Sequence, residues 1–272
     1  TCTDGLALDI TPEHERGILQ GFMVGGRSIG VIVAASSAGW IAQHMGWSAV
    51  FYFPALLTLI PVPFIFFIKE ITRTADMRFQ WSAFKAFKNK QVISAALVGL
   101  IVFLVIVGAN QDVNPHFSAR FNIDLTTAGL ITTVWGIGCV AGAFLGGIVM
   151  DKTGNRNALL LSLILVVPAL VFIAFVPSRP LMWAAAVFFG LAYGLSQAVY
   201  FALAMKYTEP SIAASMYSIL MAVTNVGQGI GLGVAGGLAK NGNFPLVFLV
   251  FAAIMFLILP FFPVLFRKKA TA

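Results

Sequence analysis

Long apolar runs separated by short polar breaks recur along the whole chain. Each run reaches the roughly 20 apolar residues that a helix needs to cross the hydrocarbon core of a bilayer. The pattern predicts one helix tail at residues 1–10 and eight full spans, with consecutive helices antiparallel because the breaks are short. The predicted spans are residues 17–42, 46–68, 91–111, 125–150, 156–176, 180–206, 210–239 and 243–266.

The composition indicates an all-α integral membrane protein. Of the 272 residues, 59% are hydrophobic and 10% are charged, whereas a soluble domain carries about 25% charged residues. A net charge of +7 is compatible with nucleic-acid binding, but the basic residues are scattered among short loops. We therefore expect the lipid bilayer as the surroundings and no nucleic-acid partner.

The longest polar connection, residues 69–90, is expected to divide the chain into two parts. Residues 1–68 are predicted to be the last part of an N-terminal half. Residues 91–272 are predicted to form a C-terminal half of six helices. The linker stretch MRFQWSAFKAFKNK mixes aromatic and basic residues, which predicts either an amphipathic helix on the membrane surface or a basic tether. Because the chain starts with Thr1 inside an apparent helix, we expect a fragment of a longer protein.

Basic residues are concentrated in alternate loops. One set of loops, which includes the linker, holds Arg16, Lys69, Arg73, Arg78, Lys85, Lys88, Lys90, Lys152, Arg156, Lys206, Arg267, Lys268 and Lys269. The opposite loops hold only Arg120, Arg179 and Lys240. Cytoplasmic loops of membrane proteins carry an excess of Lys and Arg, so the linker and the C-terminus are predicted to be cytoplasmic.

A dense group of polar residues interrupts two apolar runs in GGIVMDKTGNRNALLL, residues 146–161. Gly147, Asp151, Lys152, Gly154 and Arg156 follow the pattern G-x-x-x-D-[RK]-x-G-x-[RK]. Gly147 would permit close helix approach, and Gly154 would supply a tight turn. Asp151 can accept hydrogen bonds from free N–H groups at the start of another helix. The alternative is an ordinary charged turn in which Asp151 is a cap.

This pattern resembles the loop signature of the major facilitator superfamily, found between helices 2 and 3 and again between helices 8 and 9. The stretch LALDITPEHERG is similar to the end of helix 4 and the next loop in that family. The resemblance implies a truncated major-facilitator-type helical bundle, from the end of helix 4 through helix 12. The family's pseudo-symmetry would place Asp151 at the helix that starts near Gly17. It implies a conformational latch made of Gly147, Asp151, Lys152, Gly154, Arg156 and Glu209, in which Glu209 pairs with a basic residue.

A weak internal repeat also indicates two related halves. A shift of 197 residues aligns Arg27 with Thr224 and Gly30 with Gly227. Repeats of this kind occur in transporters, whose substrate lies between the halves near the bilayer midplane.

Arg27 is the most informative single residue, because it lies about ten residues into its predicted span, or roughly 15 Å deep. A charge at that depth is costly unless it faces a polar interior, and arginine suits bidentate contact with a carboxylate. We therefore regard Arg27 as a candidate to bind an anionic substrate group. The alternative is a structural ion pair, for example with Asp4.

Amides and phenols in later spans are further candidates for substrate contact. Tyr193, Gln197 and Tyr200 recur at helical spacing, as do Asn225 and Gln228. The full candidate set is Arg27, Gln197, Tyr193, Tyr200, Asn225, Gln228 and Asn110. Such polar stripes should turn away from lipid, either toward a cavity or as contacts between helices.

Other chemistry is sparse. Asp4 and Asp112 are the candidates for binding a coupling proton. Three histidines, His14, His44 and His116, are predicted to be surface residues rather than metal ligands. No metal or cofactor is expected, and no enzyme activity, because the sequence has no HExxH motif and no Ser/His/Asp set at a common depth.

These features imply a secondary active transporter of a small solute, most readily an organic anion, in a bacterial inner (plasma) membrane, with a proton or cation as possible coupling ion. The stretch GGRSIGVIVAASSAG lacks the proline of the family's drug–proton antiporters, which argues against multidrug efflux. The alternative is a non-transporting family member that acts as a membrane-complex assembly factor or receptor. The start TCTDGLALD resembles the family's light-harvesting-complex assembly proteins and also its muropeptide permeases, so both classes stay open.

Overall fold

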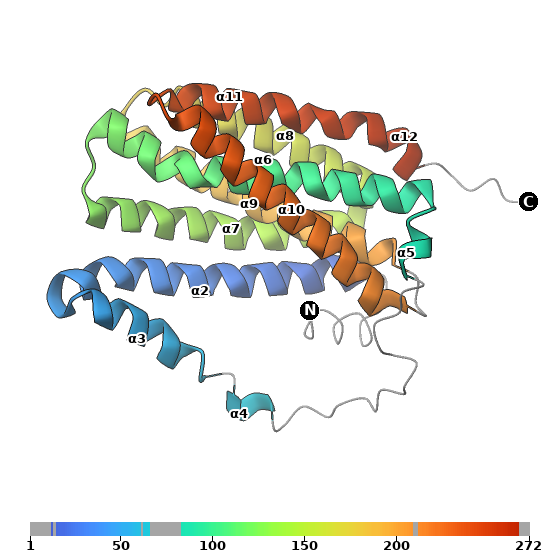
Figure 1. The fold of residues 1–272 in the computed structure, drawn as a ribbon, viewed down its shortest axis with the longest axis horizontal. Helices are drawn as coiled ribbons and strands as arrows, with labels where there is room; N and C mark the ends of the chain where they lie inside the picture. The colour runs from blue at the N-terminus through green and yellow to red at the C-terminus, as the bar shows by residue number, and fades with distance from the viewer. Residues whose placement is uncertain (1–11, 13–14, 61, 66–82, 209–211, 267–272) are drawn as a thin grey trace, which may run out of the picture.

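The structure is a bundle of long antiparallel helices (Figure 1). It is a computed structural model that describes residues 12, 15–60, 62–65, 83–208 and 212–266. Seven helices of the described residues are long and apolar enough to cross a membrane, which confirms the all-α membrane class. These are α2 (Arg16–Met45), α6 (Lys90–Phe121), α7 (Leu125–Thr153), α8 (Asn155–Ala174), α9 (Arg179–Lys206), α10 (Ala213–Ala239) and α11 (Phe244–Met255), which continues through η4 (Phe256–Phe261) and α12 (Phe262–Leu265).

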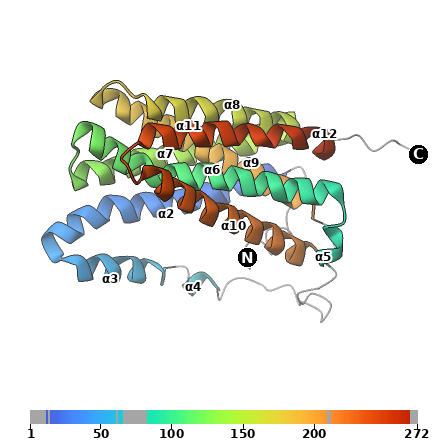
Figure 2. The same cartoon turned by 45° about the horizontal axis from the view of Figure 1, so that its top comes forward.

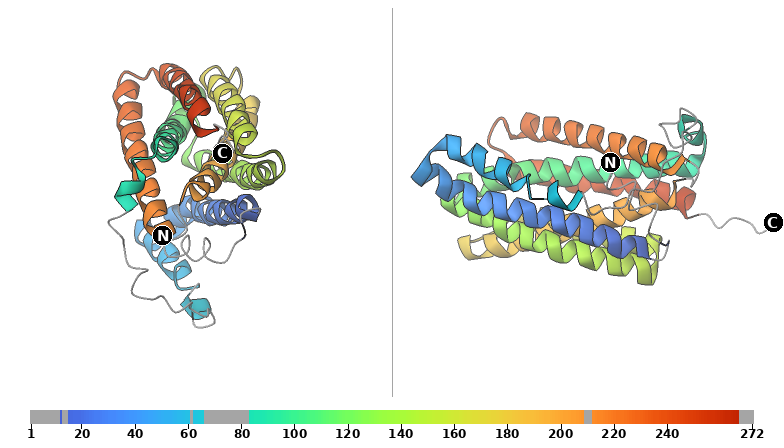
Figure 3. Two further views of the ribbon diagram at one scale, coloured as in Figure 1. Left: turned by 90° about the vertical axis from the view of Figure 1, so that its right-hand side faces the viewer. Right: turned by 90° about the horizontal axis from the view of Figure 1, so that it is seen from below.

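The predicted span 46–68 is not a continuous helix in the described residues. Helix α3 (Trp47–Leu57) contains Pro54 and gives way to a turn at residues 58–60, and α4 covers only Val62–Ile65. Pro61 follows Leu57 by four residues and has no N–H to bond the Leu57 carbonyl, which agrees with the end of α3 at Leu57. The prediction of an unbroken span is therefore wrong here, and Figure 3 shows α3 and α4 extending away from the other helices.

Helix α6 is longer than the predicted span 91–111. It starts after Asn89, whose side chain accepts a hydrogen bond from the Gln91 N–H (2.9 Å), and continues through Pro115 to Phe121. Asn122 then ends it in the left-handed conformation at φ 49°. As a result, His116 lies inside a helix with 3% of its surface exposed, which corrects the prediction of a surface histidine.

Most of the described basic residues lie in or beside the loops at one end of the bundle, at the right of Figure 1. This end contains the starts of α2, α6, α8 and α10 and the ends of α7, α9 and α12, so the expected antiparallel order is confirmed. Of the linker 69–90, the short helix α5 (Ala83–Ala86) lies at the same end. The predicted helix tail 1–10 lies outside the described residues, as do residues 77–82 of the proposed amphipathic stretch.

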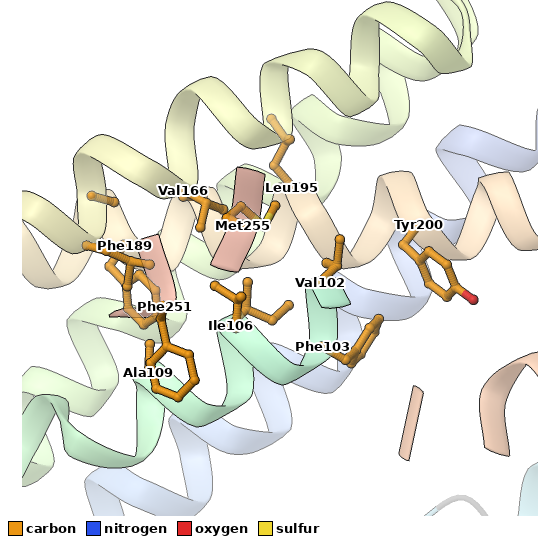
Figure 4. Close-up of a cluster of buried hydrophobic side chains, with 14 of the residues drawn as sticks. Val102, Phe103, Ile106, Ala109, Val166, Phe189, Leu195, Tyr200, Phe251 and Met255 are labelled. Atoms are coloured by element: carbon orange, nitrogen blue, oxygen red, sulfur yellow. The ribbon is translucent and has the colours of Figure 1, made fainter. Parts of the chain in front are cut away.

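The hydrophobic core lies among α6, α8, α9 and α11. Figure 4 shows Ile106 of α6, Phe189 of α9 and Phe251 of α11 gathered in it, and all three side chains are at most 1% exposed. Figure 2 shows α8 and α11 side by side above α6 and α9. In this packed group of helices, α9 lies against α6, and it also contacts α7.

Glycines set the closest helix contacts. Gly138 and Gly142 of α7 lie against the backbone of α9, and Gly190 and Gly194 of α9 lie against the backbone of α7. A Cβ atom at any of these positions would overlap a backbone carbonyl of the facing helix. The two helices therefore approach more closely than any side chain at these positions would allow.

Helix α10 contains six glycines, of which only some pack against another helix. Gly227 and Gly231 lie against the carbonyl groups of Leu100 and Leu104 on α6. At the remaining four glycines, a Cβ atom would have no neighbouring atom within 4 Å. These are Gly229, Gly233, Gly236 and Gly237. One face of α10 therefore packs on α6, and the other is open in the described structure.

Candidate functional site

Asp151 joins the end of α7 to the start of α2. Its Oδ1 accepts a hydrogen bond from the Gly17 N–H at 3.1 Å, and its Oδ2 accepts one from the Ile18 N–H at 2.9 Å. These donors belong to the first turn of α2, where helical N–H groups have no intrahelical partner and the helix dipole favours an anion. The hydrogen bonds expected of Asp151 at the helix near Gly17 are therefore present.

Two glycines make this contact possible. At Gly147 a Cβ atom would overlap the Gly17 carbonyl, and at Gly17 it would overlap the Asp151 carboxylate. Gly154, between α7 and α8, has φ +81°, a conformation that side-chain-bearing residues rarely adopt. The predicted close approach at Gly147 and tight turn at Gly154 are both confirmed.

The basic residues of the pattern lie outside this contact. Lys152 and Arg156 are exposed, and Glu209, their expected partner, lies outside the described residues. Instead Arg16 reaches the end of α9, where its Nη1 donates to the Met205 carbonyl at 3.5 Å. Arg16 and Lys206 also line a cavity of about 350 Å³ beside Asp151. Both residues were predicted only as members of the basic loops and not as members of this site.

A second cavity, of about 200 Å³, lies between α2 and the helices of the C-terminal half. It contains three predicted candidates, Arg27 on α2 and Asn225 and Gln228 on α10. The Gln228 amide donates to Asn225 Oδ1 at 3.1 Å, so the two α10 side chains form one polar group. The cavity is lined by Gln20, Met23, Val24, Arg27, Phe103, Phe201, Tyr217, Met221, Thr224, Asn225 and Gln228.

Gln20 and Thr224 were not among the predicted site residues, yet both are buried and line this cavity. The Gln20 amide lies 3.4 Å from the Met205 sulfur and 3.6 Å from the Met23 sulfur, so it ties α2 to α9. Both residues left a signal in the sequence. Gln20 lies seven residues before Arg27 on one helical face, and the internal repeat aligns Thr224 with Arg27.

The predicted stripe on α9 does not line this cavity. The Gln197 amide is buried and donates to the Tyr193 hydroxyl at 3.3 Å, and the Tyr193 ring packs on Trp135 of α7. Tyr200 is fully buried against Gly99 and Phe103 of α6, and its hydroxyl has no hydrogen-bond partner. The physical reason is that α9 is covered by several helices, so its polar side chains meet protein and not open space.

Two further candidates, Asn110 and Asp112, lie on α6. Asn110 is half-buried and does not line either cavity. Asp112 is 5% exposed. Asp4, the other acidic candidate, lies outside the described residues. No group of three or more His, Cys, Asp or Glu that could hold a metal ion occurs in the described part of the chain.

Comparison with known proteins gives relatives that are named as transport or resistance proteins. The chain is 25% identical to the sialic acid transporter NanX of Escherichia coli (strain K12), over 60% of this chain and 41% of that protein. It is 27% identical to a cis,cis-muconate transport protein of Acinetobacter baylyi, over 97% of this chain and 67% of the relative. It is 24% identical to the multidrug resistance protein MdtG of Klebsiella pneumoniae, over 90% and 61%.

The chain thus spans roughly two fifths to two thirds of the length of these relatives. The sequence profile of the Major Facilitator Superfamily matches residues 1–113 and 113–272, which together cover the chain. The fold, the glycine-lined contact at Asp151 and this match lead to one conclusion: the chain belongs to the Major Facilitator Superfamily.

Proposed function

We propose that the protein is a secondary active transporter that moves a small organic anion by alternating access. The observation that carries this proposal is Arg27, which lines the cavity between α2 and α10 without a hydrogen-bond or ion-pair partner in the described residues. A cation inside the membrane region is costly and usually marks a substrate or ion pathway. Its planar guanidinium matches a carboxylate with two parallel hydrogen bonds.

The other lining residues suit the same ligand. Thr224, Asn225 and Gln228 offer hydroxyl and amide groups, Met23 and Phe103 offer apolar surface, and the described lining contains no acidic side chain. A cavity with one cation, several neutral polar groups and no anion favours a negatively charged solute. Two of the relatives are named for organic acids, sialic acid and cis,cis-muconate, which supports this class.

In this proposal, the Asp151 contact forms and breaks as the transporter changes between its two states. It holds the end of α7 to the start of α2 at the end of the bundle that carries most basic residues. Lys152, Gly154 and Arg156 belong to the same latch, and Glu209 is its proposed acidic partner. When the hydrogen bonds to Gly17 and Ile18 break, this end can open and release the solute.

Membrane sidedness is part of the proposal. We place the linker 69–90 and the C-terminus in the cytoplasm of a bacterial inner membrane, between an N-terminal half that ends at residue 68 and a C-terminal half that starts at residue 91. A cysteine introduced by Lys88→Cys should therefore react with an impermeant maleimide only after the cells are permeabilised. A cysteine introduced by Lys240→Cys, at the opposite end of the bundle, is the matched control and should react in intact cells. The reverse labelling pattern would show that the protein has the opposite orientation in the membrane.

The substrate proposal is tested by Arg27→Gln in the full-length protein. Ligand binding is measured as a thermal shift with panels of carboxylate, neutral and cationic metabolites. We expect one carboxylate group to stabilise the unsubstituted protein, and its affinity to fall about 10- to 100-fold in the variant. A hydrogen bond to a charged group contributes about 1.5–3 kcal/mol, and each 1.4 kcal/mol is tenfold in affinity.

Two controls sharpen this experiment. Arg27→Lys keeps the charge but not the planar fork and should bind with intermediate affinity, and Arg120→Gln removes an exposed cation at the outer end of α6 and should have no effect. If Arg27→Gln lowers the folded yield while the affinity is unchanged, Arg27 is a structural residue. If no panel member stabilises the protein and a partner protein co-purifies with it, the assembly-factor alternative gains support.

A further inference from the structure

Asp112 and His116 form a buried polar pair in the outer part of α6, apart from both cavities. Their side chains are 5% and 3% exposed, respectively. They lie four residues apart and therefore share one face of the helix. Neither residue takes part in the proposed solute cavity or the latch, so their burial needs another explanation.

The Asp112 carboxyl group is poorly accommodated as an anion. Its Oδ2 has no contact with solvent and no hydrogen-bond partner. An ionised carboxylate removed from water is very costly unless a cation or hydrogen-bond donors compensate it, whereas a neutral carboxylic acid costs much less. The burial of this oxygen therefore favours the protonated group.

His116 does not supply the missing cation. Its Nε2 lies 3.0 Å from the Ile173 carbonyl of α8; because a carbonyl only accepts, Nε2 carries the hydrogen. Three phenylalanine rings surround the imidazole, those of Phe117, Phe244 and Phe248, with centroids 5.7, 6.0 and 5.4 Å away. An apolar cage of this kind favours the neutral imidazole.

No other charge of the described structure is buried beside this pair. The outer halves of α7, α8, α10 and α11 contain no ionisable side chain apart from the buried thiol of Cys139 near the middle of α7. The charged residues at this end of the bundle are Arg120, Asp124, Arg179 and Lys240, and all four are exposed. Asp124 is occupied as the cap of α7, where it accepts a hydrogen bond from the Thr127 N–H at 3.1 Å.

We propose that Asp112 is a proton-binding site inside the C-terminal helices. Its carboxyl group carries a proton while the outer parts of α6, α8 and α11 are packed as in this structure. When that packing opens to water, the carboxyl group ionises and the proton leaves to solvent. The site is independent of which solute the protein carries, because it does not share a residue with the cavity that contains Arg27.

The test is infrared spectroscopy of the full-length protein in membranes at about pH 8, where solvated carboxyl groups are ionised because the ordinary aspartate pKa is about 3.9. We expect a C=O band of a non-ionised carboxylic acid in the unsubstituted protein, and its loss in Asp112→Asn, which keeps the shape of the side chain. Asp124→Asn, a matched substitution at an exposed carboxylate, should leave the band unchanged. Asp112→Glu keeps a carboxyl group at the site and should retain the band at a shifted frequency.

Each outcome decides the proposal. A spectrum of the unsubstituted protein without such a band overturns it, even if Asp112→Asn does not fold. A band that persists unchanged in both Asp112 variants also overturns it, because another residue then holds the proton. None of these measurements requires a transported solute, so a failure here is distinct from a failure of the proposed anion transport.

Discussion

The Asp151→Asn substitution should lower the maximal rate of solute transport at least about tenfold while the solute affinity changes little. The amide has one acceptor oxygen in place of two and no charge, so at least one of the hydrogen bonds from Gly17 and Ile18 is lost. Each charge-assisted bond contributes about 1.5–3 kcal/mol, which is enough to shift a two-state equilibrium more than tenfold. Initial uptake rates and equilibrium binding in proteoliposomes measure the two quantities separately.

The matched control for this substitution is Asp124→Asn. Asp124 also accepts a backbone N–H at a helix start, but the donor, Thr127, belongs to the same helix that it caps. Its loss should destabilise the start of α7 without linking two parts of the bundle. Equal losses of rate and affinity in Asp151→Asn would argue against a latch and in favour of a general structural role.

The Gly142→Ala substitution should have the largest effect on folding. A methyl group at Gly142 would overlap the Leu191 carbonyl of α9, and backbone atoms cannot rotate away as a side chain can. The two helices must therefore separate, and this separation would also disturb the reciprocal contacts of Gly190 and Gly194. Overpacking typically costs about 1–3 kcal/mol and occasionally more, and because the clash here is with backbone we expect a cost at the upper end, which exceeds the roughly 1 kcal/mol that alanine gains over glycine in a helix. Thermal unfolding in detergent and the yield of folded protein measure the result.

A neighbouring residue provides the control for Gly142→Ala. Ala141 is exposed on the same helix, so Ala141→Val adds even more volume on a face that does not meet α9. It should leave the unfolding temperature within a few degrees of the unsubstituted protein. If the two variants unfold alike, the close approach of α7 and α9 does not limit stability.

The helices and the Asp151 contact could be predicted from sequence because their causes are local or follow a motif. Apolar runs of spanning length fix the positions of α7, α8 and α9 to within a few residues. The pattern around Asp151, with glycines at Gly147 and Gly154, carries enough detail to predict both its hydrogen-bond donors and its turn. Arg27 could be predicted as a candidate for the same reason, because a charge deep in an apolar run is conspicuous.

Other features were not predicted, because helix length and the burial of a side chain depend on the surrounding structure as well as on the local sequence. The predicted span 91–111 stops short of the end of α6, which continues through Pro115 and buries His116. In the span 46–68 the opposite occurs, because an apolar run of sufficient length does not form one continuous helix and has a turn at residues 58–60. Tyr200 shares a helical face with Tyr193, but α6 covers it completely.

By itself the sequence determined that this chain is a helical membrane protein, where most of its helices lie, and that Asp151 and Arg27 are exceptional. These properties depend on hydropathy and on the cost of charge in an apolar segment, which each stretch of the chain carries on its own. Only the tertiary structure decided which polar side chains share the Arg27 cavity and that the Asp112 Oδ2 atom is shielded from solvent. Burial is a property of the helices that pack against a face, and those helices come from distant parts of the chain.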